Sequence, residues 1–318
     1  MQSRVRGPCV LAHGAGGPPY ERSRGHVVDR GTRRPNVHTA GLEYGCGIAE
    51  HCGALWPNRW IETFTEGLQR EGVESPVILT RAGWAGMQTT GAVLWSSDIP
   101  STFESLRIQV RVGLATMMSG VTWWTTDVGG FFGGDVGSPE FRELIVRWYQ
   151  YGAFCPIFRT HGDRSPGMSP LPARGSRYGE DGAVCTAPEG HAAGAPTEPW
   201  TFGNETEPLL AEMIRLRASL RPYIQELAAN ATAAGAPPMR PLFYEFPDDP
   251  TSWLVEDAFM FGPTWLVAPI LELGARSRWV YFPGATTWRH HFTGEVYRGG
   301  QNVSVPAPLA QFPLFARI

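Results

Sequence analysis

The feature that most restricts the fold is a repeated unit: a short apolar run, a polar residue just beyond it, and then a helical pattern. The run and its polar residue occur three times, at 92–95 with Asp98, 121–124 with Asp127, and 154–158 with His161. The polar residues lie 29 and 34 residues apart, and a (β/α)8 barrel of about 250 residues uses about 31 per unit. We therefore predict an α/β fold with parallel strands, of the (β/α)8 TIM barrel type.

The polar residue of each unit falls where barrel enzymes carry catalytic groups, at the C-terminal end of a strand. Any one of these residues could instead cap a helix or form a salt bridge in a loop. Three of them in consecutive units, each with Trp or Phe nearby, favour a site. We therefore treat Asp98, Asp127 and His161 as candidate functional residues.

Helix signals separate these units. Ser101 and Glu104 have the spacing of a capping box, and the helix behind them ends at Gly120. Ser138 and Pro139 begin the next helix. We expect both helices to bury one apolar face against the strands.

The flanking segments contain further elements. We predict a helix at 61–70, a short buried strand at 77–80, and a helix at 209–234 that Pro222 kinks and Gly235 ends. Beyond about residue 253 the pattern changes to short β runs, at 265–268, 279–282 and 302–305. These runs predict a small antiparallel β domain at the end of the chain.

Composition excludes several classes of protein. With 42% hydrophobic residues and a net charge of −3, the chain is too apolar for overall disorder and lacks the basic excess of a nucleic-acid binder. No apolar run of about 18 residues predicts a membrane span. Five irregularly spaced cysteines indicate neither a disulfide framework nor a zinc site, so we expect a reduced, cytoplasmic protein without a metal or cofactor. Twelve tryptophans favour sugar binding, because aromatic faces stack on pyranose rings.

Residues 1–50 show no helical or strand period. Residues 1–40 carry seven arginines against Glu21 and Asp29, a net charge of +5. We expect this segment to be poorly structured. Its glycine-rich run at 13–17 would suit an esterase oxyanion loop, but the chain has no Gly-x-Ser-x-Gly nucleophile motif, which argues against that activity.

Several long motifs resemble glycoside hydrolase family 31, which contains α-glucosidases and α-xylosidases. They are LWSSDI at 94–99, WWTTDVGGF at 123–131, GAFCPIFRTHGDR at 152–164, MRPLFYEFPDD at 239–249, FMFGPTWLVAPILELGARSR at 259–278 and WRHHFTGEVY at 288–297. The resemblance covers roughly residues 50–318. It implies a TIM-type barrel, incomplete at its N-terminus, followed by a β-sandwich. We divide the chain into an N-terminal segment (1–50), a partial catalytic barrel (51–254) and the β-sandwich domain (255–318).

The resemblance implies a retaining α-glycosidase that acts on terminal α-linked sugars of an oligosaccharide or α-glycoside. In such enzymes one carboxyl group attacks the anomeric carbon while the other acts as acid and then as base. The family's acid/base corresponds to Asp98. By the same matching, the residues that line the sugar-binding subsite are Arg81, Trp95, Asp127, Phe131 and His161. Arg81 and His161 would donate to hydroxyls, Asp127 would accept from them, and the aromatic rings would pack on the sugar.

The sequence departs from the family pattern at two places near the acid/base. Ser97 stands where the family usually has Gly, and Thr89-Thr90 where many relatives have Arg-Tyr. Both departures bear on the outer substrate preference more than on the chemistry.

A third departure concerns the nucleophile. The family's Trp-Leu-Asp-x-x-Glu-Pro or Lys-x-Asp-x-x-Glu motif does not occur, and by spacing only Asp29 is a candidate. Two hypotheses stay open: an active glycosidase whose nucleophile is Asp29 or comes from another chain, and a truncated, inactive relative with at most weak sugar binding. The sequence leaves the sugar, the linkage and the oligomeric state open. No nucleic-acid or membrane partner is expected.

Overall fold

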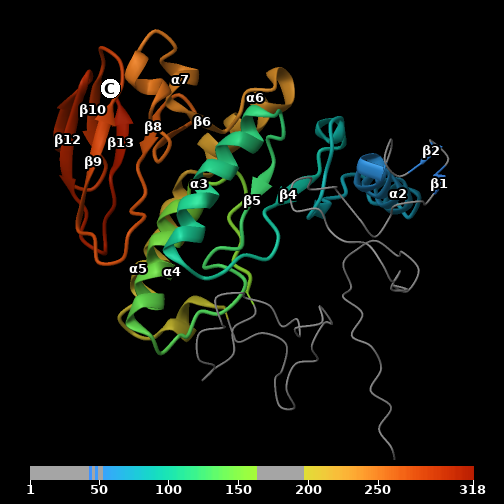
Figure 1. Cartoon of the computed structure of the whole chain (residues 1–318), viewed down its shortest axis with the longest axis horizontal. Helices are drawn as coiled ribbons and strands as arrows, with labels where there is room; N and C mark the ends of the chain where they lie inside the picture. The colour runs from blue at the N-terminus through green and yellow to red at the C-terminus, as the bar shows by residue number, and fades with distance from the viewer. Residues whose placement is uncertain (1–42, 45–46, 49–52, 163–196) are drawn as a thin grey trace, which may run out of the picture. The chain divides into compact units, whose positions relative to one another are not determined.

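The computed structural model describes residues 43–44, 47–48, 53–162 and 197–318 (Figure 1). These residues fall into two compact units, one that ends at Ala92 and one that begins at Val93. Each unit is described by itself below. In the part of the chain that the structure describes, none of the helices combines the length and the hydrophobicity that a membrane span requires.

The unit that ends at Ala92 is built around one helix. Its elements are β1 (Glu43–Tyr44), β2 (Gly47–Ile48), η2 (Gly53–Leu55), α2 (Trp56–Arg70), β3 (Leu79–Thr80) and η3 (Met87–Thr90). The predicted helix begins earlier than expected because Pro57 suits a first turn, where its missing amide hydrogen costs nothing. The predicted strand at 77–80 shrinks to β3, and Val77 is 82% exposed. The prediction of burial is wrong there, since an apolar run alone does not show which side will be covered.

The second unit opens with the predicted strand and helix alternation. Its first elements are β4 (Val93–Trp95), α3 (Phe103–Met118), β5 (Trp124–Thr125) and α4 (Pro139–Gly152). Strands β4 and β5 are parallel, with Leu94 opposite Trp124 and Trp95 opposite Thr125. A helix that joins two parallel, paired strands is a βαβ unit. The spacing of the polar residues in the sequence therefore predicts this part of the fold correctly.

The two helix starts have different outcomes. Ser138 caps α4 and accepts from the amide of Phe141, as predicted. At α3 the cap is Thr102, which accepts from the amide of Ser105, so the prediction of Ser101 and Glu104 is wrong by one residue. The Ser101 amide is instead bonded to the carbonyl of Phe132, 2.9 Å away, and this tertiary contact places Ser101 outside the helix.

The predicted strand at 154–158 is mostly a turn. The Phe154 and Cys155 amides bond back to the end of α4, at 3.0 Å each. Pro156 has no amide hydrogen and cannot donate a hydrogen bond to a neighbouring strand. Only then does the chain run beside β5: the Ile157 amide donates to Trp124, and Val128 forms a parallel bridge with Thr160.

The long helix predicted at 209–234 is divided in two. After η4 (Pro199–Phe202) come α5 (Glu207–Ser219) and α6 (Arg221–Ala234). Pro222 separates them, because its ring and missing amide hydrogen interrupt the helical ladder. Gly235 ends α6 in the left-handed conformation, with φ 67°, and donates to the carbonyl of Ala231.

The C-terminal part forms two antiparallel sheets. One has the order β11-β10-β13-β8-β7-β6 and the other pairs β12 with β9. Their strands are β6 (Met239–Pro241), β7 (Phe259–Phe261), β8 (Trp265–Val267), β9 (Ser277–Phe282), β10 (Thr287–His290), β11 (Val296–Arg298), β12 (Gln301–Pro306) and β13 (Leu314–Arg317), with α7 (Leu242–Glu245) and η5 (Pro250–Trp253) between β6 and β7. Phe282 of β9 stacks on Tyr297 and meets Phe315 edge-on, so side chains of both sheets share one core. The six-stranded sheet already begins at Met239.

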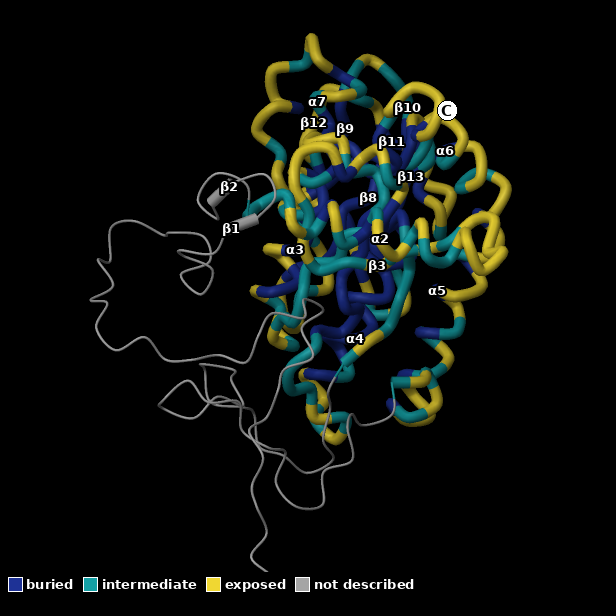
Figure 2. The backbone as a smooth tube through the Cα atoms, turned by 90° about the vertical axis from the view of Figure 1, so that its right-hand side faces the viewer, coloured by how far each residue is buried: buried dark blue, intermediate teal, exposed yellow. Residues whose placement is uncertain are grey.

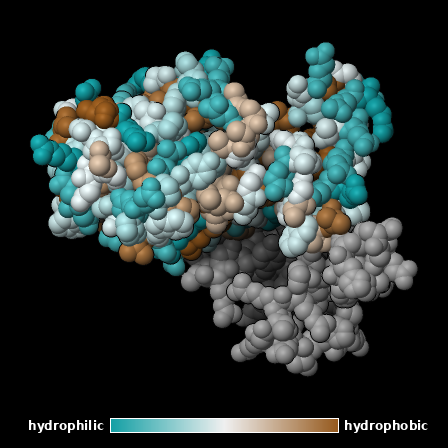
Figure 3. All heavy atoms as spheres, turned by 90° about the horizontal axis from the view of Figure 1, so that it is seen from above, coloured by the Kyte–Doolittle hydropathy of each residue, from teal (hydrophilic) through white to brown (hydrophobic). Residues whose placement is uncertain are grey.

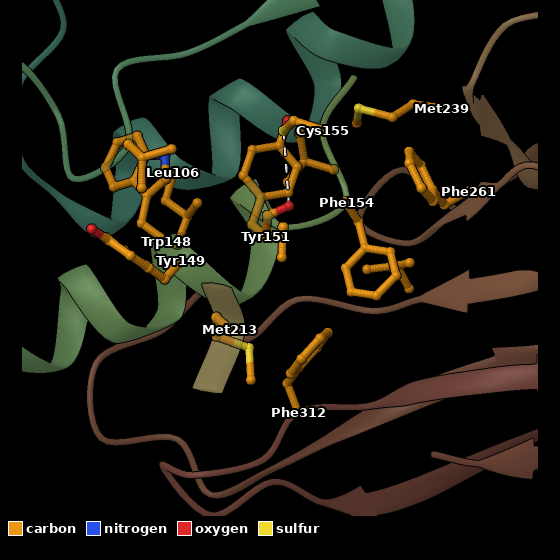
Figure 4. Packing of buried hydrophobic residues seen from close by; sticks show 14 of the residues in the cluster. Leu106, Trp148, Tyr149, Tyr151, Phe154, Cys155, Met213, Met239, Phe261 and Phe312 are labelled. Carbon is orange, nitrogen blue, oxygen red and sulfur yellow. Dashed lines mark hydrogen bonds between the residues drawn. The ribbon is translucent and has the colours of Figure 1, made fainter. Parts of the chain in front are cut away.

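A second core joins the helices to these sheets. Phe154 packs edge-on against Phe261 of β7, at 5.5 Å between ring centroids, and against Phe312, at 6.0 Å (Figure 4). Helix α4 is buried along most of its length (Figure 2). The helices and the C-terminal strands of this unit are therefore held by one continuous apolar cluster.

Polar side chains of α4 bind the C-terminal loops through hydrogen bonds and an ion pair. Arg147 is fully buried, and its guanidinium donates to the carbonyls of Ala307 and Gln311, both at 2.9 Å, and to Ala275 at 3.2 Å. Burial lowers the pKa of Arg147 to about 10, so it stays protonated at neutral pH. Glu143, one turn earlier, forms a two-oxygen ion pair with Arg276.

Candidate active site

Three neighbouring chain segments carry the predicted residues that lie in the second unit. Trp95 is the last residue of β4, and Asp98 lies in the loop after it. Asp127 and Phe131 lie in the loop after β5, and His161 follows the segment that runs beside that loop. In a parallel arrangement, segments of this kind end at the same edge of the sheet. The contacts between them show how closely these ends are joined.

The loops after β4 and β5 are bonded to each other through their backbones. The amides of Phe131 and Phe132 donate to the carbonyl of Ile99, at 2.7 and 3.0 Å, and the amide of Ser101 donates back to Phe132. Pro100 and Phe132 form a parallel bridge. Asp98, directly before Ile99, is therefore held against the loop that carries Phe131.

Gly130 permits this close approach. A Cβ atom at Gly130 would lie 2.5 Å from the Cα of Ser101, and its φ of +79° is in the left-handed region. Both observations require glycine. The WWTTDVGGF motif therefore includes a residue that brings the two loops together.

Ser97 has an unusual backbone conformation. It is the only residue other than glycine with a positive φ in the described part of the chain, at 66°. L-residues seldom adopt this conformation because the Cβ atom approaches the following carbonyl. Glycine would adopt this conformation without that cost, so Ser97 places a strained residue next to Asp98.

Asp127 is completely buried and forms an ion pair with Arg159. The Arg159 guanidinium also lies over the ring of Trp95, 5.9 Å from its centroid. Its side chain remains 24% exposed. A buried carboxylate, a partly exposed guanidinium and an indole from three neighbouring segments therefore form one group.

Sequence reasoning did not single out Arg159. A signal was present, since Arg159 directly follows the strand predicted at 154–158 and lies two residues before His161, and alternate residues of an extended chain share one face. What the sequence does not show is the pairing with Asp127, which arises only because Val128 donates to the Arg159 carbonyl and aligns the two segments.

Phe131 and His161 lie together, with ring centroids 5.3 Å apart and planes tilted by 43°. Phe131 also meets Phe132 edge-on. The site therefore has an aromatic and imidazole side beside the carboxylate and guanidinium pair.

Two other predicted residues do not lie in the described part of the second unit. Arg81 directly follows β3 in the unit that ends at Ala92, where it is half-buried, and its role as a donor to sugar hydroxyls stays a prediction. Asp29 lies outside the described residues. Among the residues that the structure describes, no three His, Cys, Asp or Glu side chains are grouped to hold a metal ion.

Two sequence profiles match the chain. The first, for the family 31 glycosyl hydrolase TIM-barrel domain, matches residues 32–171, and the second, for the C-terminal domain of that family, matches residues 235–318. Together they cover more than half of the chain. The chain belongs to glycoside hydrolase family 31. Its fold is thus a family 31 TIM-barrel domain followed by the family's C-terminal β domain.

Similar proteins include α-glycosidases of two kinds. The chain is 34% identical to an α-xylosidase of Saccharolobus solfataricus over 281 residues, which cover 88% of the chain and 34% of that protein. It is 32% identical to α-xylosidase A of Aspergillus niger, covering 88% and 38%. It is also 36% identical to α-glucosidase 2 of Bacillus thermoamyloliquefaciens, covering 76% and 26%.

A similar solved structure is a family 31 α-xylosidase from a soil metagenome, complexed with xylose. Its TM-score is 0.77 at 42% identity, and the match covers 86% of this chain and 39% of that one. The chain thus spans about a third of the length of the curated α-xylosidases that it matches.

Proposed function

We propose that this family 31 chain carries the acid/base side of a retaining α-glycosidase active site, of the α-xylosidase or α-glucosidase type. The observation that carries the proposal is the backbone pairing of the loops after β4 and β5, which holds Asp98 beside the Phe131 loop. The α-xylosidases and α-glucosidases of similar sequence support the substrate class.

In the proposed reaction Asp98 gives its proton to the glycosidic oxygen as the bond to the anomeric carbon breaks. A second carboxylate attacks that carbon, about 5–5.5 Å from the first carboxyl group in retaining enzymes. Asp98 then removes a proton from water, which displaces the sugar from the nucleophile with the starting configuration restored. The aromatic rings of Trp95 and Phe131 would pack on the sugar, and His161 would donate to a hydroxyl.

The pairing of Asp127 with Arg159 refines the binding role expected for Asp127. One Asp127 oxygen is engaged by Arg159, and the partly exposed Arg159 has further N–H groups. We propose that the pair binds sugar hydroxyls as a unit: Asp127 holds the guanidinium of Arg159 in place, and the remaining N–H groups of Arg159 donate hydrogen bonds to the hydroxyls.

A second candidate function is sugar binding without catalysis, in a barrel incomplete at its N-terminus. The absence of the family's nucleophile motif favours it, because acid–base assistance alone is worth only about 10²–10⁴-fold. We expect little or no turnover by the chain as it stands unless Asp29 or another chain supplies the nucleophile.

The test is hydrolysis of p-nitrophenyl α-xyloside and α-glucoside, with the first anomer identified by NMR. The proposed activity requires an α-anomer product and its loss in Asp98→Asn, while Glu226→Gln, which removes an exposed carboxylate on α6, has no effect. Loss in Asp29→Ala with recovery in azide would identify Asp29 as the nucleophile. A β-anomer product would refute a retaining mechanism.

Absence of turnover, together with xylose binding that Trp95→Ala abolishes, would support the second candidate. Absence of both turnover and binding would refute both functions.

A further inference from the structure

One exposed tryptophan of the C-terminal part is held in a fixed plane. Trp253, at the end of η5, stacks on Phe243 of α7, with ring centroids 4.4 Å apart and planes 10° from parallel. Its indole N–H donates to the carbonyl of Pro247 at 2.9 Å. The stack covers one face of the indole, and the hydrogen bond prevents rotation in the plane. Yet Trp253 is 57% exposed, and Leu254 after it is 79% exposed.

The other interactions of this segment leave one of its carboxylates without a partner. Residues 245–257 contain five acidic residues and no basic residue. Four have partners: Glu245 pairs with Arg240, Glu256 with Arg111, Asp257 with Arg278, and Asp249 accepts from Tyr281. Within the described residues, Asp248 alone of the five forms no hydrogen bond or ion pair. It directly follows Pro247, the residue that binds the indole.

The small extent of the exposed apolar surface favours a small ligand over a protein partner. Protein interaction sites usually need a contiguous apolar patch, whereas the large hydrophobic residues that this segment exposes are Trp253, Leu254 and, to a lesser degree, Tyr244. Elsewhere, on the face that Figure 3 shows, hydrophobic residues are interspersed with hydrophilic ones. A rigid aromatic plane matches a pyranose, whose C–H face packs on the ring, and an unpaired carboxylate in the same segment can accept from the sugar hydroxyls.

We propose that Trp253, Phe243 and Asp248 form a surface subsite for a pyranose unit of an oligosaccharide or polysaccharide, separate from the group around Asp98. The sugar stacks on the open face of Trp253, Phe243 supports the indole from behind, and Asp248 accepts from hydroxyls. The choice of a sugar rests on the proposed glycosidase function. Such a subsite keeps the chain close to a polymeric substrate without taking part in bond cleavage.

The test is affinity electrophoresis of the full chain in native gels with dextran or xyloglucan, using the Asp98→Asn background so that no polymer is cleaved. We expect Trp253→Ala to lower the retardation constant at least 10-fold and Asp248→Asn to lower it several-fold. Trp279→Ala removes a tryptophan of β9 that is 64% exposed and should leave retardation unchanged. Circular dichroism checks folding, and Trp253→Phe keeps a flat ring if the alanine variant does not fold.

Several results would overturn the inference: no retardation by either polymer, equal retardation of the Trp253 and Trp279 variants, or binding of a lysine-rich peptide in place of the sugars. Retardation that depends on Trp253 in a chain without turnover would support the subsite and count against the proposed activity. Turnover that depends on Asp98, with no retardation, would support the proposed activity and count against the subsite.

Discussion

Replacing Ser97 by glycine should stabilise the protein, because the native chain holds this residue at φ 66°. The left-handed conformation costs an L-residue roughly 1–2 kcal/mol. Glycine removes that cost but gives the unfolded chain more conformational freedom, a loss of about 0.5–1 kcal/mol. The expected net gain in the free energy of unfolding is therefore about 0.5–1 kcal/mol.

Urea unfolding measures this gain as a higher midpoint at an unchanged slope. A gain of 1 kcal/mol corresponds to a rise in Tm of about 2–4 °C for a domain of 150–250 residues. Ser97→Ala is the matched control, since it keeps the Cβ atom and removes only the hydroxyl, so any stability that the hydroxyl supplies appears in this variant alone.

A Ser97→Gly variant less stable than Ser97→Ala would refute the reasoning, because the two differ only in the Cβ atom and the backbone freedom that it restricts. Where the chain turns over substrate, Ser97→Gly should retain activity, since glycine adopts the same φ and leaves the Asp98 loop bonded to the Phe131 loop through Ile99.

Three further perturbations test other parts of the structure. Gly130→Ala should cost roughly 2–4 kcal/mol of stability from the clash with Ser101 and the positive φ, whereas Gly133→Ala, with a φ of +78° and no atom within 4 Å, should lose only the backbone part; equal losses would contradict the clash. Arg147→Met should destabilise by about 3–5 kcal/mol, because it leaves buried carbonyls without donors, and a loss below 1 kcal/mol in urea unfolding would contradict that role. Burial lowers the pKa of both His290 and His291, so their protonation favours the unfolded state. The free energy of unfolding should therefore be highest above about pH 6.5, the pKa of histidine in the unfolded chain, and fall as the pH drops through the lower pKa values of the folded state. Its dependence on pH should be weaker when both residues are replaced by Asn.

The sequence predicts the elements whose signals are local. Ser138 and Pro139 start α4 because a cap and a first-turn proline act within four residues. The alternation of β4, α3 and β5 follows from apolar period and spacing. Where a tertiary contact competes, the local signal fails: the bond from Ser101 to Phe132 moves the start of α3 by one residue.

The partners of buried polar groups cannot be predicted from the sequence. An arginine such as Arg147 on an amphipathic helix is normally expected to be solvated, yet its carbonyl partners lie 128 to 164 residues away. The same holds for Arg159, whose partner Asp127 is 32 residues earlier. A sequence window contains the donor or the acceptor but not both, so only the fold shows that each charge is compensated.

Helix α4 connects the candidate site to the C-terminal β domain. It begins a few residues after Phe132, whose loop is bonded to the Asp98 loop, and it ends shortly before Arg159, which pairs with Asp127. Its buried Arg147 is bonded to C-terminal loop carbonyls. A shift of α4 would therefore move both segments that hold Asp127 and Arg159 together. Because close-packed interiors transmit such displacements, packing of the C-terminal β domain against α4 contributes to the alignment of the site.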